Sequence, residues 1–273
     1  MKRLSLPVVA ALVLTACATS PLGRQQFLFL PAAEMDQMGA TAYNEMKEQQ
    51  PTVTGTAESR YVECVAEAIV AVVDSDQQWE VTVFEDDSAN AFALPGGKIG
   101  VHTGLLKVAD NQDQLAAVIG HEVGHVLAQH SNERMSIQYA TQTGTQLVAA
   151  LAGGDSAEKQ TLMGLLGVGA QYGVQLPFSR KHEAEADVIG LDLMAEAGFD
   201  PRQSVNLWQN MAANSGGSPP EFLSTHPSNQ TRIEGLQARI PEAMPLHQHA
   251  KSARRPPNFG PPPPSRPHTA PPA

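Results

Sequence analysis

Two histidines four residues apart, set among apolar residues, constrain this chain more than any other feature. The motif is His121-Glu122-Val123-Gly124-His125. Apolar residues recur around it at helical spacing, which predicts a helix over about 112–130. The predicted apolar stripe comprises Leu115, Val118, Ile119, Val123 and Leu127. Side chains four apart share one face of a helix, so the two imidazoles converge and can bind one metal ion, while Glu122 can reach a water on that ion.

Two glycines, Gly120 and Gly124, lie inside this predicted helix. Each costs on the order of 1 kcal/mol relative to alanine in a helix interior. Glycine is tolerated where another part of the structure must approach the backbone closely. We therefore expect a close neighbour at these two positions.

A second helix, predicted over 180–197 and closed by Gly198, carries two acids four residues apart. A catalytic zinc takes three protein ligands and keeps one position open. Glu183 is the candidate third ligand, and Asp187 is the candidate acceptor of a hydrogen bond from the back of a ligand imidazole. A plainly solvated acidic face is the alternative, although the neighbouring residues are mostly apolar. Glu185 is expected to point elsewhere as a surface carboxylate.

The remaining patterns predict a mostly helical chain with a small sheet placed early. Further helices are predicted over 34–48, 57–73, 201–213 and 229–239, and two more within 133–172 with a break at Gly153-Gly154. A strand is predicted over 80–84, a hairpin over 90–101 that turns at Pro95-Gly96-Gly97, and a loop over 214–220. This arrangement indicates the α+β class.

The N-terminus is typical of an exported lipoprotein. A positive start is followed by the apolar run Leu4 to Leu14, which is too short to span a bilayer comfortably. The run leads into Leu14-Thr15-Ala16-Cys17, which resembles the bacterial lipobox and implies cleavage before Cys17 and lipidation of that residue. Ala18 in the next position implies the outer membrane. An ordinary signal peptide, or a buried helix with an incidental cysteine, are the alternatives.

Composition along the chain predicts four segments. We expect a lipoprotein signal peptide over 1–16, a linker to the lipid anchor over 17–33, one folded domain over 34–240 and a disordered tail over 241–273. The tail holds 11 prolines, which fix φ and remove backbone donors. The chain carries a net charge of −10; the signal contributes +2 and the tail +3, so residues 18–240 carry −15. A domain this acidic argues against nucleic acid as a partner.

Together these motifs resemble the gluzincin metallopeptidase family that includes HtpX and the CAAX prenyl proteases. The resemblance is carried by His-Glu-x-x-His, by Glu-x-x-Ala-Asp 62 residues after the first histidine, by the hairpin 90–97, by Gly104-Leu105-Leu106, and by Thr225-His226-Pro227 with Arg232 downstream. It covers roughly residues 20–240. It implies a zincin-like domain that holds one Zn²⁺ per chain through His121, His125 and Glu183, with Glu122 as the catalytic carboxylate. The membrane-spanning members have transmembrane helices that are missing here, so the chain is similar to the periplasmic lipoprotein branch typified by BepA and LoiP.

Other zinc patterns fit less well. The metzincin pattern needs glycine at position 128 and histidine at position 131, where this chain has Ala128 and Ser131. His130 lies off the predicted ligand face and is expected to be an exposed histidine at the helix end. His102 and His182 are expected to be structural or surface residues.

His226 precedes Pro227 in a loop before the last predicted helix. In relatives, a histidine in this Thr-His-Pro context can approach the zinc. Three roles stay open: a removable fourth ligand that keeps the peptidase latent, a donor to the transition state, or a surface histidine.

The first strand of the predicted hairpin is the candidate substrate-binding strand. Its residues are Asn90, Ala91, Phe92, Ala93 and Leu94. An extended peptide could add to it as a further strand of the sheet, a mode that reads main chain more than side chains and favours unfolded segments. Core packing of Phe92 and Leu94 is the alternative, and both can hold.

The function that these features predict is a zinc-dependent endopeptidase of the bacterial cell envelope. It would be lipid-anchored, facing the periplasm from the outer membrane, and would hydrolyse peptide bonds in misfolded or stalled envelope proteins. The first alternative is a chaperone or assembly factor for outer-membrane proteins that uses the same groove, with proteolysis latent. The second is a lipoprotein whose zinc is structural, in which no water would hold the fourth position. The sequence leaves the natural substrate and the oligomeric state open.

Overall fold

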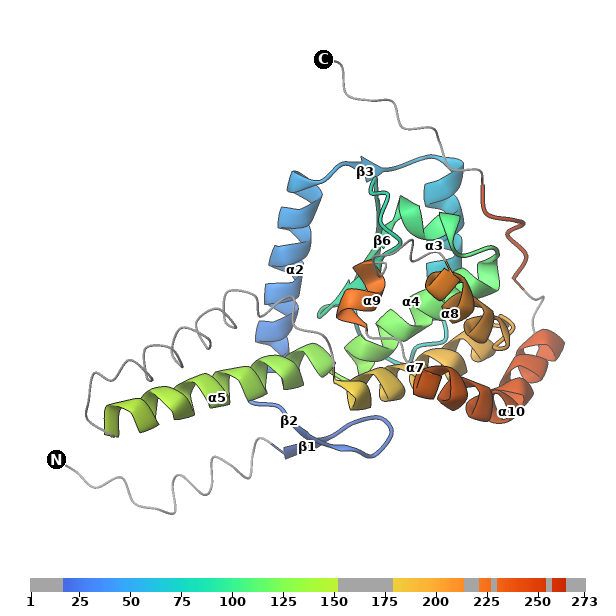
Figure 1. Ribbon diagram of the computed structural model, residues 1–273. Helices are drawn as coiled ribbons and strands as arrows, with labels where there is room; N and C mark the ends of the chain where they lie inside the picture. The colour runs from blue at the N-terminus through green and yellow to red at the C-terminus, as the bar shows by residue number, and fades with distance from the viewer. Residues whose placement is uncertain (1–16, 152–178, 214–220, 227–229, 254–256, 264–273) are drawn as a thin grey trace.

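A computed structural model describes residues 17–151, 179–213, 221–226, 230–253 and 257–263 of the 273-residue chain (Figure 1). The helices are α2 (Ala32–Gln49), α3 (Ala57–Val70), α4 (Gln112–Leu127), α5 (His130–Leu151), α7 (Arg180–Glu196), α8 (Gln203–Ala213), α9 (Glu221–Thr225) and α10 (Gln230–Ala253), with a short 3₁₀ helix η1 (Thr103–Lys107). The strands are β1 (Cys17–Thr19), β2 (Gln25–Phe27), β3 (Thr52–Val53), β4 (Glu80–Phe84), β5 (Ala91–Leu94) and β6 (Lys98–His102). The predicted α+β class is confirmed.

The larger sheet has the strand order β3-β4-β6-β5. Strand β4 runs parallel to β6, with Glu80 opposite Lys98, and β5 runs antiparallel to β6, with Ala93 opposite Ile99. The predicted hairpin is therefore present as β5 and β6, and its turn uses Gly96 at φ 80°, in the left-handed region that favours glycine. Strand β5 lies at the edge of this sheet and contacts α4.

Helix α4 lies at the centre of the domain (Figure 1). It contacts α3, β5, α7 and α8, and 12 of its 16 residues are buried. The Asn111 side chain caps its first turn by accepting a hydrogen bond from the backbone N–H of Gln114, so the helix begins where the sequence predicts. The His-Glu-x-x-His motif is thus held in the core rather than on a surface helix.

The two glycines of α4 mark its closest approach to α7. A Cβ on Gly120 would lie 2.8 Å from the carbonyl oxygen of Gly190, and one on Gly124 would lie 2.9 Å from that of Ala186. Real Cβ atoms essentially never approach other heavy atoms this closely. The close neighbour expected at both glycines is therefore confirmed, and it is the helix that carries Glu183.

The predicted end of the last helix at residue 239 is wrong. Helix α10 continues through Pro241 and Pro245 to Ala253. A proline removes one helical hydrogen bond, but these two lie four residues apart and are exposed, so water can solvate the carbonyls left without a partner. The opposite face of α10 packs on α7 and α8, and that burial outweighs the local cost. Its buried residues are Arg232, Leu236, Ala243, His247 and Ala250.

Part of the predicted disordered tail also docks on the domain. The Gln112 side chain at the start of α4 donates a hydrogen bond to the carbonyl of Pro257 at 2.7 Å and accepts one from the backbone N–H of Phe259 at 2.8 Å. The Phe259 ring lies 6.5 Å from that of Phe199. Pro257 and Phe259 of the described segment 257–263 therefore contact the domain.

Other differences concern short elements. The β1–β2 hairpin, β3 and α9 are absent from the sequence-based prediction, because strands of two or three residues and a single helical turn have no measurable periodicity. The predicted break at Gly153-Gly154 and the predicted loop over 214–220 lie outside the described residues. Within the part of the chain that the structure describes, no helix combines the length and apolar character needed to cross a bilayer.

Candidate metal centre

Four buried side chains from three parts of the chain meet beside α4. His121 and His125 come from α4, Glu183 from the first turn of α7, and His226 directly follows α9. Each is at most 3% exposed, and one ligand atom from each lies within 4.8 Å of the other three. The structure thus brings together the three predicted ligands and the residue whose role the sequence left open.

The spacing of these atoms fits a single tetrahedral ion. Ligand atoms on a zinc at its usual bond lengths of about 2.0–2.1 Å lie roughly 3.3–3.4 Å apart. His121 Nε2 lies 3.1 Å from His125 Nε2, 3.3 Å from His226 Nδ1 and 3.5 Å from Glu183 Oε2. Glu183 Oε1 lies 3.5 Å from His125 Nε2 and 3.2 Å from His226 Nδ1. Two α4 imidazoles, one α7 carboxylate and a third imidazole therefore form a donor set of the right kind and size.

Asp187 supports His121 from behind. Its Oδ1 lies 3.0 Å from His121 Nδ1, the ring nitrogen that faces away from the other ligand atoms. A proton held there leaves Nε2 free to coordinate a metal. Burial alone would raise the pKa of Asp187, but the charge and hydrogen bonds of Arg232 outweigh it and lower that pKa, so the carboxylate stays ionised.

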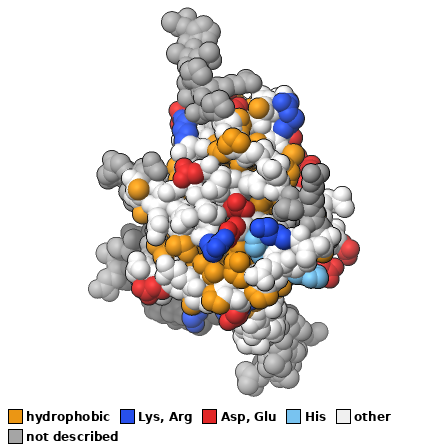
Figure 2. Space-filling view, turned by 90° about the vertical axis from the view of Figure 1, so that its right-hand side faces the viewer, with side chains coloured by type: hydrophobic (Ala, Val, Ile, Leu, Met, Phe, Trp, Pro, Cys, Tyr) orange, Lys and Arg blue, Asp and Glu red, His pale blue; other side chains and the backbone are white. Residues whose placement is uncertain are grey.

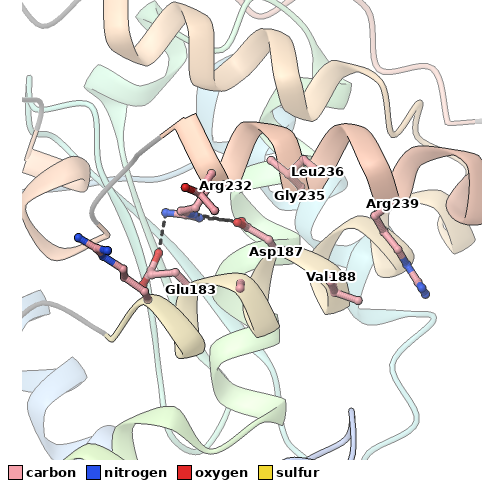
Figure 3. A pocket seen from close by; sticks show the side chains of 10 residues that line it. Glu183, Asp187, Val188, Arg232, Gly235, Leu236 and Arg239 are labelled. Atoms are coloured by element: carbon pink, nitrogen blue, oxygen red, sulfur yellow. Dashed lines mark hydrogen bonds and ion pairs between the residues drawn. The ribbon is translucent and has the colours of Figure 1, made fainter.

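Arg232 is a site residue whose role the sequence did not reveal. Its Nε and one terminal nitrogen donate to the Asp187 carboxylate at 2.8 and 2.6 Å, and its other terminal nitrogen lies 2.6 Å from Glu183 Oε2 (Figure 3). Its guanidinium lies over the Trp208 ring at 4.1 Å from the centroid. One buried cation thus orients both Glu183 and Asp187. A cavity of about 200 Å³ lies beside this ion pair between α7 and α10, with Val188 and Leu236 in its walls.

Figure 2 shows one face of the molecule, where a few acidic, basic and histidine side chains lie close together near the centre, with hydrophobic side chains mainly below them.

Glu122 has the environment of a general base. The residue is 2% exposed, and burial raises the pKa of its carboxyl group. Its Oε2 accepts a hydrogen bond of 3.3 Å from the backbone N–H of Ala93 in β5, and its Oε1 lies 3.4 Å from His226 Nε2. The carboxylate therefore lies between the ligand cluster and the edge strand.

The protein itself sets opposite proton affinities on the two α4 histidines. Burial would lower the pKa of His121, but its hydrogen bonds to Asp187 and Glu183 outweigh burial and raise the pKa to about 9. For His125 burial dominates, and the pKa lies well below the usual value. In the metal-free protein, His121 is therefore the ligand whose proton a metal must displace.

Comparison with known proteins agrees with this geometry. The family model described as peptidase family M48 matches residues 56–240, about two thirds of the chain. The chain belongs to peptidase family M48. It is 41% identical over 187 residues to the mitochondrial metalloendopeptidase OMA1 of Schizosaccharomyces pombe, a match that covers 67% of this chain and 53% of that protein. It is also 30% identical over 222 residues to the beta-barrel assembly-enhancing protease of Yersinia pestis, covering 79% of this chain and 45% of that protein. The chain spans about half the length of these relatives.

His226 of this M48 domain is not a surface histidine, so that reading of the sequence is wrong. The residue is 3% exposed, and its ring stacks on Phe222 at a centroid distance of 4.5 Å. The turn of α9 delivers it, because the His226 backbone N–H donates to the Phe222 carbonyl at 2.9 Å. Pro227, the next residue, lies outside the described residues.

Two further predictions about this M48 domain are wrong. His130 is fully buried rather than exposed, and Glu185 is 6% exposed rather than a surface carboxylate. His130 lies between His125 and Glu185, while Glu185 also contacts the N-terminal hairpin. Burial lowers the pKa of His130 to about 4, so this ring is neutral near pH 7. The helical spacing of α7 places Glu185 away from Glu183, as predicted, but the chain before α2 covers that side.

His102 and His182, expected to be structural or surface residues, are both buried, which favours the structural alternative. His102 Nδ1 lies 2.7 Å from Ser88 Oγ, and His182 Nε2 lies 3.1 Å from Glu133 Oε2.

The predicted substrate strand is the edge strand β5. Ala91 and Ala93 are buried toward the core, while Phe92 and Leu94 are half-buried. The Phe92 ring lies 5.8 Å from Phe84 and 6.2 Å from His102, so core packing accounts for part of its role. The other role, peptide binding, stays a prediction, and the position of β5 beside Glu122 is compatible with it.

Proposed function

We propose that this chain is a zinc-dependent endopeptidase of the bacterial cell envelope. One observation supports this above all: three imidazole nitrogens and one carboxylate, all buried, are spaced as ligands of a single tetrahedral ion beside a buried glutamate. When bound, zinc would supply Lewis acidity, lowering the pKa of a water molecule and polarising a peptide carbonyl. His121, His125 and Glu183 would hold it.

The chemistry required of the protein falls to Glu122. It would take the proton of the attacking water and deliver a proton to the leaving amine. Its raised pKa suits both steps, because it increases the affinity of the carboxylate for the water proton and brings its pKa nearer to neutral pH. The Ala93 N–H holds the carboxylate in place.

Substrate would bind along β5 as an added strand. Within the described part of the sheet this strand pairs with β6 on one side and has no neighbouring strand on the other, and it also contacts α4, so its open edge is the one that a peptide could join. A peptide bound in this way is held mainly through its main-chain hydrogen bonds, so its side chains contribute little to recognition. We therefore propose that unfolded or misassembled envelope proteins, including stalled outer-membrane proteins, are the substrates.

The proposed location rests on the lipobox at Cys17, which would anchor the chain to the outer membrane facing the periplasm. Two kinds of relative bear on it. The Yersinia pestis protein is named for enhancing beta-barrel assembly, whereas the Schizosaccharomyces pombe protein is named as mitochondrial. The lipobox favours the bacterial envelope.

We propose further that His226 is the removable fourth ligand. Its Nδ1 completes the tetrahedral spacing, and its Nε2 lies near Glu122, so it would exclude water from the fourth position. This latency favours one alternative function, an assembly factor that holds clients in the same groove. Glu122→Gln separates the two: assembly function that survives this change would favour the chaperone role.

The test of the proposed function is hydrolysis of unfolded casein by the purified mature chain with zinc present. We expect cleavage that chelation abolishes and that Glu122→Gln abolishes without loss of metal. Failure to cleave in both the unchanged chain and His226→Ala, with zinc bound in each, would count decisively against a peptidase.

A further inference from the structure

His125 has a support of its own on the side away from the other ligands. Its Nε2 faces the ligand cluster, and its Nδ1 lies 2.9 Å from Nδ1 of His130. A metal on Nε2 requires the His125 proton to be on Nδ1, so His125 is the donor and His130 the acceptor. The His130 proton must then be on Nε2, which lies 3.1 Å from Glu185 Oε2. Glu185, as a carboxylate, can only accept, so each proton in this chain of hydrogen bonds has one possible place.

The β1–β2 hairpin holds Glu185. Ser20 Oγ and Arg24 Nε both donate to the Glu185 carboxylate, the second at 2.7 Å. The terminal nitrogens of Arg24 form a bidentate pair with Glu133 of α5 at 2.8 and 2.6 Å. Gln26 donates to the same Glu133 carboxylate at 3.0 Å and to the Ala128 carbonyl at 2.6 Å. Residues about 160 positions away in sequence thus fix the orientation of one carboxylate on α7.

Glu133 and Glu185 are buried, so both carboxylates depend on their partners in the hairpin. The Glu133 and Glu185 side chains are 8% and 5% exposed, and Arg24 pairs with both. Burial would raise the pKa of Glu133, but hydrogen bonds from Arg24 and Gln26 outweigh it and lower the pKa to about 2. His182 stacks on His130 at a centroid distance of 4.5 Å and contacts Glu133, which closes the remaining side. Arg24 pairs with both carboxylates, so loss of the hairpin would remove a permanent positive charge from beside two buried negative ones.

We infer that the β1–β2 hairpin belongs to the metal centre, because Ser20 and Arg24 position Glu185, Glu185 orients His130, and His130 fixes the tautomer and ring plane of His125. His130 and Arg24 are positioning residues that act through His125. The hairpin begins at Cys17, so the segment next to the proposed lipid anchor also determines the affinity of the site for metal. This inference rests on the proposed metal binding and adds a determinant that lies before the residues matched by the M48 family model.

The test compares zinc affinity among variants of the full mature chain by competition with a chromophoric chelator. His130→Leu removes the acceptor for His125 and should weaken zinc binding about 10–100-fold, the usual effect of losing an outer hydrogen-bond partner. His130→Asn can place its side-chain oxygen near the position of Nδ1 and should restore most of the affinity. Arg24→Gln, which leaves every ligand and His130 in place, should also weaken binding. His249→Ala, which removes an exposed histidine on α10, is the matched control and should change nothing.

A second readout separates positioning from general destabilisation. Cobalt in place of zinc gives an absorption spectrum that reports the ligand geometry, and His130→Leu and Arg24→Gln should shift it in the same direction. Should His130→Leu fail to fold, Arg24→Gln supplies both measurements. Variants that unfold at lower temperature yet keep wild-type zinc affinity and cobalt spectrum would show a structural role only and overturn the inference. An unchanged chain that binds no zinc would instead overturn the proposed function and this inference together.

Discussion

Gly190 of α7 lies against the backbone of His121 in α4. A Cβ on Gly190 would lie 2.6 Å from the His121 nitrogen, closer than real Cβ atoms come to other heavy atoms. The two helices therefore come very close together at His121, one of the proposed metal ligands. That approach lets Asp187, almost one turn before Gly190, reach the outer nitrogen of His121 at 3.0 Å.

Gly190→Ala should consequently push the two helices apart at the site. Overpacking of a dense core typically costs about 1–3 kcal/mol of unfolding free energy, and the separation should also weaken zinc binding. Gly235→Ala on α10 is the matched control, because no heavy atom lies within 4 Å of its added Cβ. The control should be neutral or stabilising by up to about 1 kcal/mol through helix propensity. Denaturant titration measures the stability of both variants. Equal stabilities of Gly190→Ala and Gly235→Ala would show that Gly190 is not tightly packed against His121.

Glu183→Ala should remove metal while leaving a folded chain. The carboxylate is the only protein ligand predicted from α7. Its loss leaves the two α4 imidazoles and the removable His226, and it takes away the acid that Arg232 contacts at 2.6 Å, so zinc binding should weaken greatly. Metal analysis after gel filtration should fall from roughly one zinc per chain to near zero. Glu122→Gln should keep its zinc and lose about 10²–10⁴-fold in hydrolysis, since it loses general base catalysis alone. Full zinc retention by Glu183→Ala would remove this residue from the ligand set.

Zinc affinity should rise with pH. His121 faces Asp187, Glu183 and Arg232, and in the metal-free chain its pKa is about 9, so below that pH zinc must displace one proton from this ring. The affinity should increase about tenfold per pH unit between roughly pH 7 and 8.5. Competition titrations at three pH values measure the slope. Asp187→Asn removes a hydrogen bond that raises the pKa of His121, so zinc affinity should depend less steeply on pH in this variant.

The raised pKa of His121 also determines how the stability of the metal-free chain changes with pH. A folded-state pKa raised above the ordinary 6.5 gives stability that is fully present below pH 6.5 and is lost as the pH rises through about 9. The metal-free chain should therefore lose up to about 3 kcal/mol of unfolding free energy over this interval. Unfolding curves in the presence of a chelator test this; stability that rises from pH 6.5 to 9 would contradict it.

Local patterns were sufficient to predict the central elements of the site. The spacing of His121 and His125 places both on one helical face whatever the rest of the chain does. Glu183 and Asp187 follow the same rule on α7, and the glycines of α4 indicate the close contact that joins the two helices. The structure brings these four side chains together as the periodicity requires.

Groups whose surroundings come from distant segments could not be predicted in the same way. His130 and Glu185 look solvated in their own helices, because their partners Ser20 and Arg24 lie in a short hairpin without periodicity. Arg232 has the opposite difficulty: an arginine on a helix is usually exposed, and only the tertiary fold pairs it with Asp187. Helix α10 continues through Pro241 because its packing on α7 and α8 outweighs the cost of a proline inside a helix. The sequence reveals that cost but not the packing.

The His226→Ala variant tests the proposed latency most directly. His226 Nδ1 lies 3.2 Å from Glu183 and 3.3 Å from His121, where it completes the spacing of four ligands and leaves no room for a water in the same place. If closure is favoured by about 1.4 kcal/mol, only about a tenth of the molecules are open at any time, so removing the imidazole should raise casein hydrolysis about tenfold. His249→Ala, on the exposed face of α10, should leave the rate unchanged, and His226→Ala combined with Glu122→Gln should be inactive. A donor to the transition state would instead give a loss on the order of 10²–10³-fold in kcat, because the barrier would lose a hydrogen bond made only there. The direction of the change in kcat therefore decides between a ligand that blocks the site and a residue that works within it.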